Sequence, residues 1–155
     1  MIHLIQRKSK VQNNLQSLAN EAQFLVLNRS SGEKLFEKSQ NNLESDQNVD
    51  WMLQQFRGNI VIDGCNPYEE NDWKIIKIVG QNLTLDVKGL CTRCNVIGVN
   101  QSNSERVQEP LQTLAKSESN RFKFGILAGS AISMEGSVLE IGNEVITSNV
   151  NFKNH

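Results

Sequence analysis

Short apolar segments separated by polar turns recur along most of this chain. Residues 73–79 and 83–87 flank Gly80 and are predicted to pair as a hairpin, because the second arm alternates apolar and polar positions. Further apolar runs of strand length stand at residues 22–27, 60–62, 96–99, 122–128, 131–134 and 138–146. Many short strands with few helices predict a mainly β fold, and specifically a barrel.

Two short helices are predicted to interrupt the strands. Apolar residues within 49–56 fall at i, i+3, i+4 and i+7, which is one face of an amphipathic helix, and Asn48 is placed to cap it. Pro110 suits the first turn of a second helix, because proline lacks the N–H that a helix start leaves unpaired. The polar stretches 6–19 and 39–48 are predicted to be a surface segment and a loop.

Length, charge and cysteine number narrow the class of protein. A chain of 155 residues is predicted to form one domain. Its net charge of −1 argues against a nucleic-acid partner held by a basic surface. The apolar run at residues 1–5 is too short for a membrane span or a signal peptide, so we expect no membrane partner. Three cysteines, an odd number, indicate a reducing, cytoplasmic setting.

The clearest pointer to chemistry is the segment C-T-R-C at residues 91–94, which holds two thiols and a guanidinium. A structural zinc site needs four ligands, and the chain adds only Cys65 and two histidines near its ends. A thioredoxin-like redox pair opens a helix after a strand, whereas residues 95–99 are predicted to continue as a strand. Both interpretations are therefore disfavoured.

Two interpretations of the cysteine pair stay open. In the first, a thiolate at Cys91 or Cys94 binds a soft metal or carries sulfur, and Arg93 between them favours the ionised thiol. In the second, both cysteines are small buried side chains that fill the barrel wall. The pattern of residues alone does not decide between them.

Arg57 stands between a predicted helix and a predicted strand, and Gly58 and Asn59 follow it. Arginine binds phosphate and other oxyanions through two parallel hydrogen bonds, and a glycine lets backbone N–H groups approach a ligand closely. The alternative is that Arg57 only stabilises the C-terminal end of the helix, where its positive charge interacts favourably with the helix dipole. The acidic loop at residues 68–73 is interpreted as a solvated turn rather than an acid–base pair, and Cys65 as a buried filler.

Four separated segments carry a resemblance to a known family. They are F-R-G-N-I-V-I-D-G-C at residues 56–65, Y-E-E-N-D-W at 68–73, C-T-R-C at 91–94 and E-P-L-Q-T-L at 109–114. In this order and spacing they resemble the MOSC domain, the C-terminal domain of molybdenum cofactor sulfurases. The resemblance implies a MOSC domain with a mainly β, barrel-like fold and a few short helices over residues 18–150, after a polar N-terminal segment at residues 1–17.

The resemblance also implies a function. A MOSC domain of this kind binds the molybdenum cofactor (molybdopterin) and presents it for exchange of an oxo ligand for a sulfido ligand. Xanthine dehydrogenase and aldehyde oxidase need that sulfurated cofactor and are implied as partners. The parent enzyme is a sulfurtransferase whose desulfurase domain uses pyridoxal phosphate. That domain is absent here, so the chain is expected to be a fragment that does not complete its barrel.

The site residues follow from the same resemblance. In related amidoxime-reducing proteins the second cysteine of this motif ligates molybdenum, which implies that Cys94 is the metal ligand and the catalytic or sulfur-accepting thiolate. Arg57 and Arg93 are implied to hold the pterin phosphate or the oxo groups, and Asn59 to donate hydrogen bonds. Cys91 is implied to belong to the cofactor-binding residues, either as a thiol that supports Cys94 from behind or as a resolving thiol.

Two alternative functions are compatible with the resemblance. The first is a MOSC-type molybdenum oxidoreductase that reduces N-hydroxylated compounds. The second is a degenerate binding module without chemistry, in which the shortened chain does not capture the cofactor.

Overall fold

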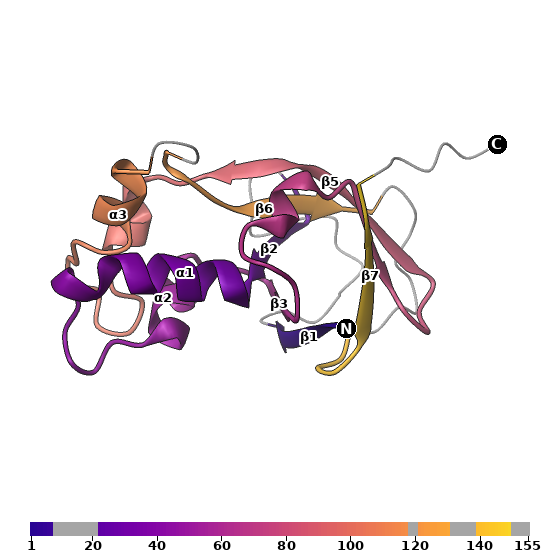
Figure 1. Cartoon of the computed structure of the whole chain (residues 1–155), viewed down its shortest axis with the longest axis horizontal. Helices are drawn as coiled ribbons and strands as arrows, with labels where there is room; N and C mark the ends of the chain where they lie inside the picture. Colours follow the sequence, from indigo (N-terminus) through magenta and orange to yellow (C-terminus); the bar gives the residue numbers. More distant parts are fainter. Residues whose placement is uncertain (8–21, 118–120, 131–138, 150–155) are drawn as a thin grey trace.

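The computed structural model describes residues 1–7, 22–117, 121–130 and 139–149, and within these ranges seven strands close into a barrel (Figure 1). The strands follow one another around the barrel in the order β1-β3-β2-β6-β5-β4-β7. Their bounds are β1 Ile2–Arg7, β2 Phe24–Asn28, β3 Ile60–Asp63, β4 Ile75–Ile78, β5 Leu83–Thr92, β6 Lys123–Gly129 and β7 Glu144–Ser148. The predicted mainly β barrel is therefore confirmed.

Three short helices lie together at one end of the barrel (Figure 1). They are α1 (Arg29–Ser39), α2 (Val49–Gln55) and α3 (Leu111–Ala115). Single 3-10 turns stand beside them at η1 (Gln40–Asn42), η2 (Glu69–Asp72) and η3 (Asn95–Gly98). Helices α1 and α2 form the crossover between β2 and β3, which run parallel.

Strand β1 completes the barrel, and this corrects the expectation of an open one. It pairs antiparallel with β3 on one side and with β7 on the other. The Leu4 N–H also donates to the carbonyl of Asn143 at 3.0 Å, and the Leu4 carbonyl accepts from Gly142 N–H at 2.8 Å. The expectation was wrong because residues 2–7 supply the closing strand, while residues 8–21 lie outside the described residues.

Several predicted elements are confirmed. All five residues of β2 are buried, and β4 and β5 form the predicted antiparallel hairpin. Helix α2 begins after Asn48, whose side-chain oxygen accepts from the Trp51 N–H at 2.9 Å. Helix α3 begins directly after Pro110. The strand predicted at residues 131–134 lies outside the described residues.

Two segments differ from the sequence-based expectation. Helix α1 is not predicted by apolar periodicity, because it buries few large side chains; instead the Asn28 side chain caps it by accepting from Ser30 N–H at 3.0 Å. Residues 96–99 were predicted as a strand, which is wrong. The Ile97 N–H donates to the carbonyl of Cys94 at 3.3 Å, so the chain makes a 3-10 turn that buries Ile97.

The apolar core has two parts. The first fills the barrel and includes Leu4, Trp73, Leu85 and Ile126. The second lies between the barrel wall and the helices, and is formed by buried side chains from α1, α2, α3 and the outer face of the strands: Leu27, Leu35, Met52, Phe56, Leu114 and Phe124 among others. The end of β5, where the cysteine segment begins, packs against this second part.

Candidate cysteine–arginine site

The cysteine segment lies where β5 leaves the barrel wall. The last paired residue of β5 is Thr92, which lies opposite Lys123 of β6. The Arg93 N–H then donates to the carbonyl of Phe122 at 2.6 Å. Cys94 follows as the residue that opens η3. The backbone is thus held against β6 and the residue before it up to Arg93, and Cys94 is the first residue beyond these contacts.

The Arg93 side chain ties this segment to the end of α2. Its Nη2 donates to the carbonyl of Phe56 at 2.5 Å and its Nη1 to Cys91 Sγ at 3.0 Å. The guanidinium carbon also lies 5.3 Å from the centroid of the Phe56 ring, which in turn stacks on Phe124 at 4.1 Å. Within the described residues, its buried Nε has no hydrogen-bond partner. Arg93 is therefore primarily a structural bracket between β5 and α2.

The three cysteines occupy different environments. Cys91 is half-buried and packs against the apolar cluster beneath the helices, whereas Cys94 is exposed. Cys65 is half-buried against the barrel core, and burial together with the nearby carboxylates of Glu70 and Glu69 raises the pKa of its thiol to about 12. The interpretation of both motif cysteines as buried filler therefore fits Cys91 and does not fit Cys94.

Arg57 is exposed at the turn between α2 and β3, with a φ of 57°. A non-glycine residue in this left-handed region is uncommon, and Gly58 stands next to it. Gly58 is required at its own position for a different reason: a Cβ there would lie 2.5 Å from Cδ1 and Cγ of the buried Leu27. No ion pair holds Arg57 within the described residues, so its guanidinium is available to a ligand.

Asn59 is buried, with 7% of its surface exposed, and is engaged with β2. Its Oδ1 accepts from the Leu25 N–H at 2.7 Å, and its own N–H donates to the Leu25 carbonyl at 2.9 Å. These two bonds fix the start of β3 beside β2. The structure thus brings Arg93, Cys91 and the turn at Phe56 together, while Asn59 lies on the inner side of that turn.

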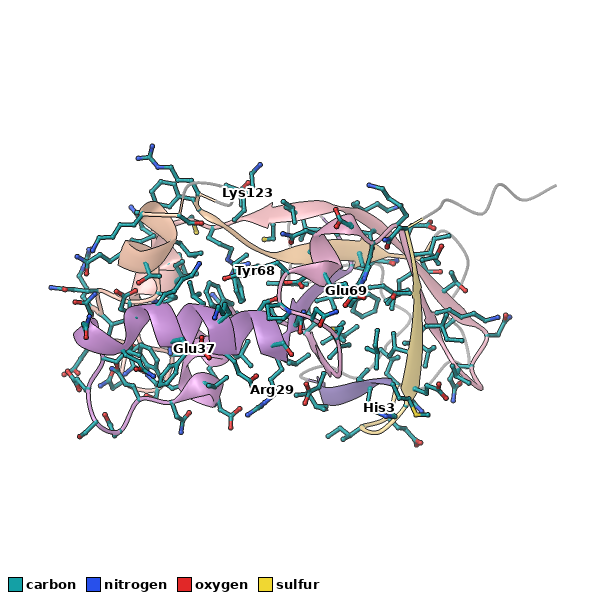
Figure 2. The ribbon with its side chains drawn as sticks, viewed as in Figure 1. His3, Arg29, Glu37, Tyr68, Glu69 and Lys123 are labelled. Carbon is teal, nitrogen blue, oxygen red and sulfur yellow. The ribbon has the colours of Figure 1, made fainter. Side chains whose placement is uncertain are left out.

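The acidic loop is tied to α1, which corrects its interpretation as a solvated turn. Glu70 is 1% exposed, accepts from Asn28 Nδ2 at 2.8 Å and from Ser31 Oγ at 2.7 Å. Burial is the largest influence on its pKa and raises it, partly offset by these hydrogen bonds. The Tyr68 N–H donates to Ser31 Oγ at 2.7 Å, and Figure 2 shows Tyr68 and Glu69 on this loop beside α1. Glu70 therefore acts as a structural anchor.

Two general properties of the described residues complete the picture. None of the helices found there is long and apolar enough to cross a membrane. Likewise, the described part of the chain contains no group of three or more histidine, cysteine, aspartate or glutamate side chains placed to hold a metal ion. His155, considered with the zinc alternative, lies outside the described residues.

Fold and site together define a closed, mainly β barrel that carries an exposed thiol beside a bracketing arginine at the end of one strand. The family model described as MOSC domain matches residues 14–146. The chain belongs to the MOSC domain family.

Similar proteins point in the same direction. The chain is 39% identical over 137 residues to a molybdenum cofactor sulfurase of Danio rerio, an alignment that covers 84% of this chain and 16% of the relative. It is 35% identical over 123 residues to molybdenum cofactor sulfurase 2 of Culex quinquefasciatus, covering 78% of this chain and 16% of the relative. A Drosophila melanogaster molybdenum cofactor sulfurase is 36% identical over 121 residues, with 78% and 14% covered. The chain thus spans about one sixth of the length of these relatives.

Proposed function

We propose that this chain is the molybdenum cofactor-binding module of a molybdenum cofactor sulfurase, in which the cofactor is the substrate that exchanges an oxo for a sulfido ligand. Membership of the MOSC family and the names of the relatives support this proposal. The single observation that carries it onto particular residues is the exposed thiol of Cys94, held at the end of β5 by the Arg93 bracket.

Cys94 suits two steps of such a reaction. A thiolate is a good ligand for a soft metal centre. It is also a nucleophile for sulfur transfer: attack of Cys94 Sγ on the terminal sulfur of a donor persulfide forms a new S–S bond at Cys94, and the donor leaves as its thiolate. Both steps require a thiol that a large ligand or a partner domain can reach, which is the case for Cys94 and less so for the half-buried Cys91.

We assign different roles to Arg57 and Arg93. Arg57 is exposed and carries no ion pair within the described residues, so we assign it to the anionic groups of the cofactor, where a guanidinium binds in two-pronged fashion. Arg93 already donates to the Phe56 carbonyl and to Cys91, so we assign it to placing the Cys94 segment next to the Arg57 turn. Asn59 supports that turn from beneath through its bonds to Leu25.

The decisive measurement is the molybdenum and pterin content of the chain purified from cells that make the cofactor. We expect wild-type protein to retain both, and Cys94→Ser to retain neither while its circular dichroism and melting temperature stay unchanged. The matched control is Cys65→Ser, because Cys65 packs against the barrel core on a different loop and is expected to leave cofactor content unchanged.

A third variant separates the two motif cysteines. Cys91→Ser should lower the stability of the fold slightly, because Cys91 packs against the apolar cluster, but should keep the metal. Equal molybdenum content in wild type and Cys94→Ser would contradict the assignment of Cys94 as ligand. A folded wild-type chain that carries no molybdenum and no pterin would instead support the degenerate binding module.

A further inference from the structure

A second feature is an open pocket between the helices and the start of β6, where Lys123 lies opposite Thr92 of the cysteine segment. Its cavity volume is about 620 Å³, which is within the range of sites for nucleotide-sized ligands. Leu35 of α1 and Leu114 of α3, both 2% exposed, form apolar parts of its lining. Tyr68 of the acidic loop adds an aromatic side chain, and Figure 2 shows it between α1 and the strand that carries Lys123. The pocket is thus built from elements far apart in the sequence.

The charged side chains that line this pocket, among the described residues, are all positive. Three lysines line it, one from each surrounding element: Lys38 from α1, Lys116 from the end of α3 and Lys123 from β6. Within the described residues, no carboxylate belongs to its lining and none of the three lysines forms an ion pair. Because no carboxylate of the described lining balances these three charges, the pocket favours an anionic ligand.

Two acids close in sequence to residues of the lining are engaged in other interactions. Glu37 precedes Lys38 on α1 but pairs with Lys34 at 2.9 Å. Glu109 is 2% exposed; its Oε1 accepts from Asn42 Nδ2 at 2.9 Å and its Oε2 from the Thr113 N–H at 3.1 Å. Glu109 is therefore buried and hydrogen-bonded to two residues of the lining, Asn42 and Thr113, and does not itself line the pocket.

We propose that this lysine pocket binds a phosphate monoester carried on an organic group. The lysines recognise the phosphate dianion, and the apolar side chains with Tyr68 accommodate the attached group. Inorganic phosphate alone is much smaller than the cavity and would make only the charged contacts. The ligand is either the phosphate end of the molybdenum cofactor or a different organic phosphate, and the chemistry of recognition is the same.

The test uses AMP as a phosphate monoester, adenosine as the same molecule without phosphate, and inorganic phosphate. Binding to the full chain is measured by isothermal titration calorimetry at low ionic strength. We expect AMP to bind, inorganic phosphate to bind more weakly, and adenosine not to bind detectably. Absence of AMP binding at millimolar concentration, or equal binding of adenosine, overturns the proposal.

Variants locate the binding. The triple variant Lys38→Gln, Lys116→Gln and Lys123→Gln should weaken AMP binding by about tenfold or more, from the loss of three partly screened charge contacts. Lys34→Gln is the matched control on α1, because this lysine pairs with Glu37 and does not line the pocket. All four lysines are exposed, so the variants should fold. Equal weakening by Lys34→Gln overturns the proposal as well.

One further comparison identifies the source of the phosphate. If chain loaded with molybdenum cofactor no longer binds AMP, the cofactor phosphate occupies the lysine pocket; if it still binds AMP, the pocket serves a separate organic phosphate. The proposal does not depend on the function proposed above. Cys94→Ser should leave AMP binding unchanged, so failure at the thiol and failure at the lysine pocket give different results.

Discussion

Replacing Arg93 with methionine should remove the contacts that hold the cysteine segment against the end of α2. Methionine keeps most of the length and the apolar stem of the side chain but removes all of its donors. The change deletes the hydrogen bond to the Phe56 carbonyl, the contact with Cys91 Sγ and the stacking of the guanidinium over the Phe56 ring. It leaves a carbonyl at the end of α2 without its partner.

The size of the effect can be worked from these contacts. A hydrogen bond from a charged donor contributes about 1.5–3 kcal/mol. Cation–π stacking adds about 0.5–1 kcal/mol at an exposed site. Sulfur is a weak acceptor, so we count nothing for Cys91. Because Arg93 is half-buried and solvent can replace part of the lost bond, we expect Arg93→Met to lower the free energy of unfolding by about 2–3 kcal/mol.

The assay is urea unfolding followed by circular dichroism, together with the melting temperature, which should fall by roughly 4–12 °C for a chain of this size. Arg121→Met is the matched control: Arg121 stands 5.4 Å from the centroid of the Phe122 ring, is exposed, and should cost less than about 1 kcal/mol. If the two variants are equally stable, Arg93 is not a structural bracket and the reasoning fails.

Three further predictions follow from buried or crowded groups. Gly58→Ala should lower the free energy of unfolding by about 1–3 kcal/mol, measured by urea unfolding, because the added Cβ overpacks against Leu27. In the Leu27→Ala background the same change should cost much less. If the losses of the two single variants simply add in the double variant, the contact is contradicted. Burial raises the pKa of Glu70, so the stability that Glu70 contributes is complete below about pH 4.5 and declines as the pH rises through its folded-state pKa. Glu70→Gln should flatten this decline in the free energy of unfolding. Parallel pH profiles of the variant and the wild type would contradict the prediction. With a thiol reagent at pH 7.5, Cys94 should react first because it is exposed, and Cys65 should react last because its pKa is near 12. The reaction of each cysteine is followed by mass spectrometry. The opposite order would refute the assigned exposures.

Most of the barrel could be predicted from sequence because its strands carry their own signals. The β5 arm of the hairpin begins with alternating apolar and polar residues, and β2 and β3 are mostly apolar runs, as expected for strands covered on both faces. Helix α1 could not be predicted by periodicity, because it is fixed by contacts distant in sequence. Its Ser31 binds the buried Glu70, and its Gly32 lies so close to Leu53 that a Cβ would be 2.6 Å from that side chain.

The sequence predicted which residues make up the candidate site, but not the contacts that hold them in place. The motif places Cys91, Arg93 and Cys94 together, but no local pattern shows that Arg93 reaches the Phe56 carbonyl, 37 positions away. The 3-10 turn after Cys94 resembles a strand in sequence because the three residues that follow Asn95 in it are valine, isoleucine and glycine, which are apolar or small. The lysine pocket is invisible to any local pattern, since its cations come from three separate elements.

The end of β5 decides which cysteine can meet a ligand. Cys91 belongs to the strand and packs against the apolar cluster between the barrel wall and the helices. Arg93 is then held twice, by its backbone on Phe122 and by its side chain on Phe56. Cys94 follows that double attachment, so its thiol is both exposed and restricted in position. A site of this kind would lose ligand affinity through misplacement of Cys94 if Arg93 were replaced, even by lysine, because a single ammonium cannot reproduce the two-directional fork of the guanidinium.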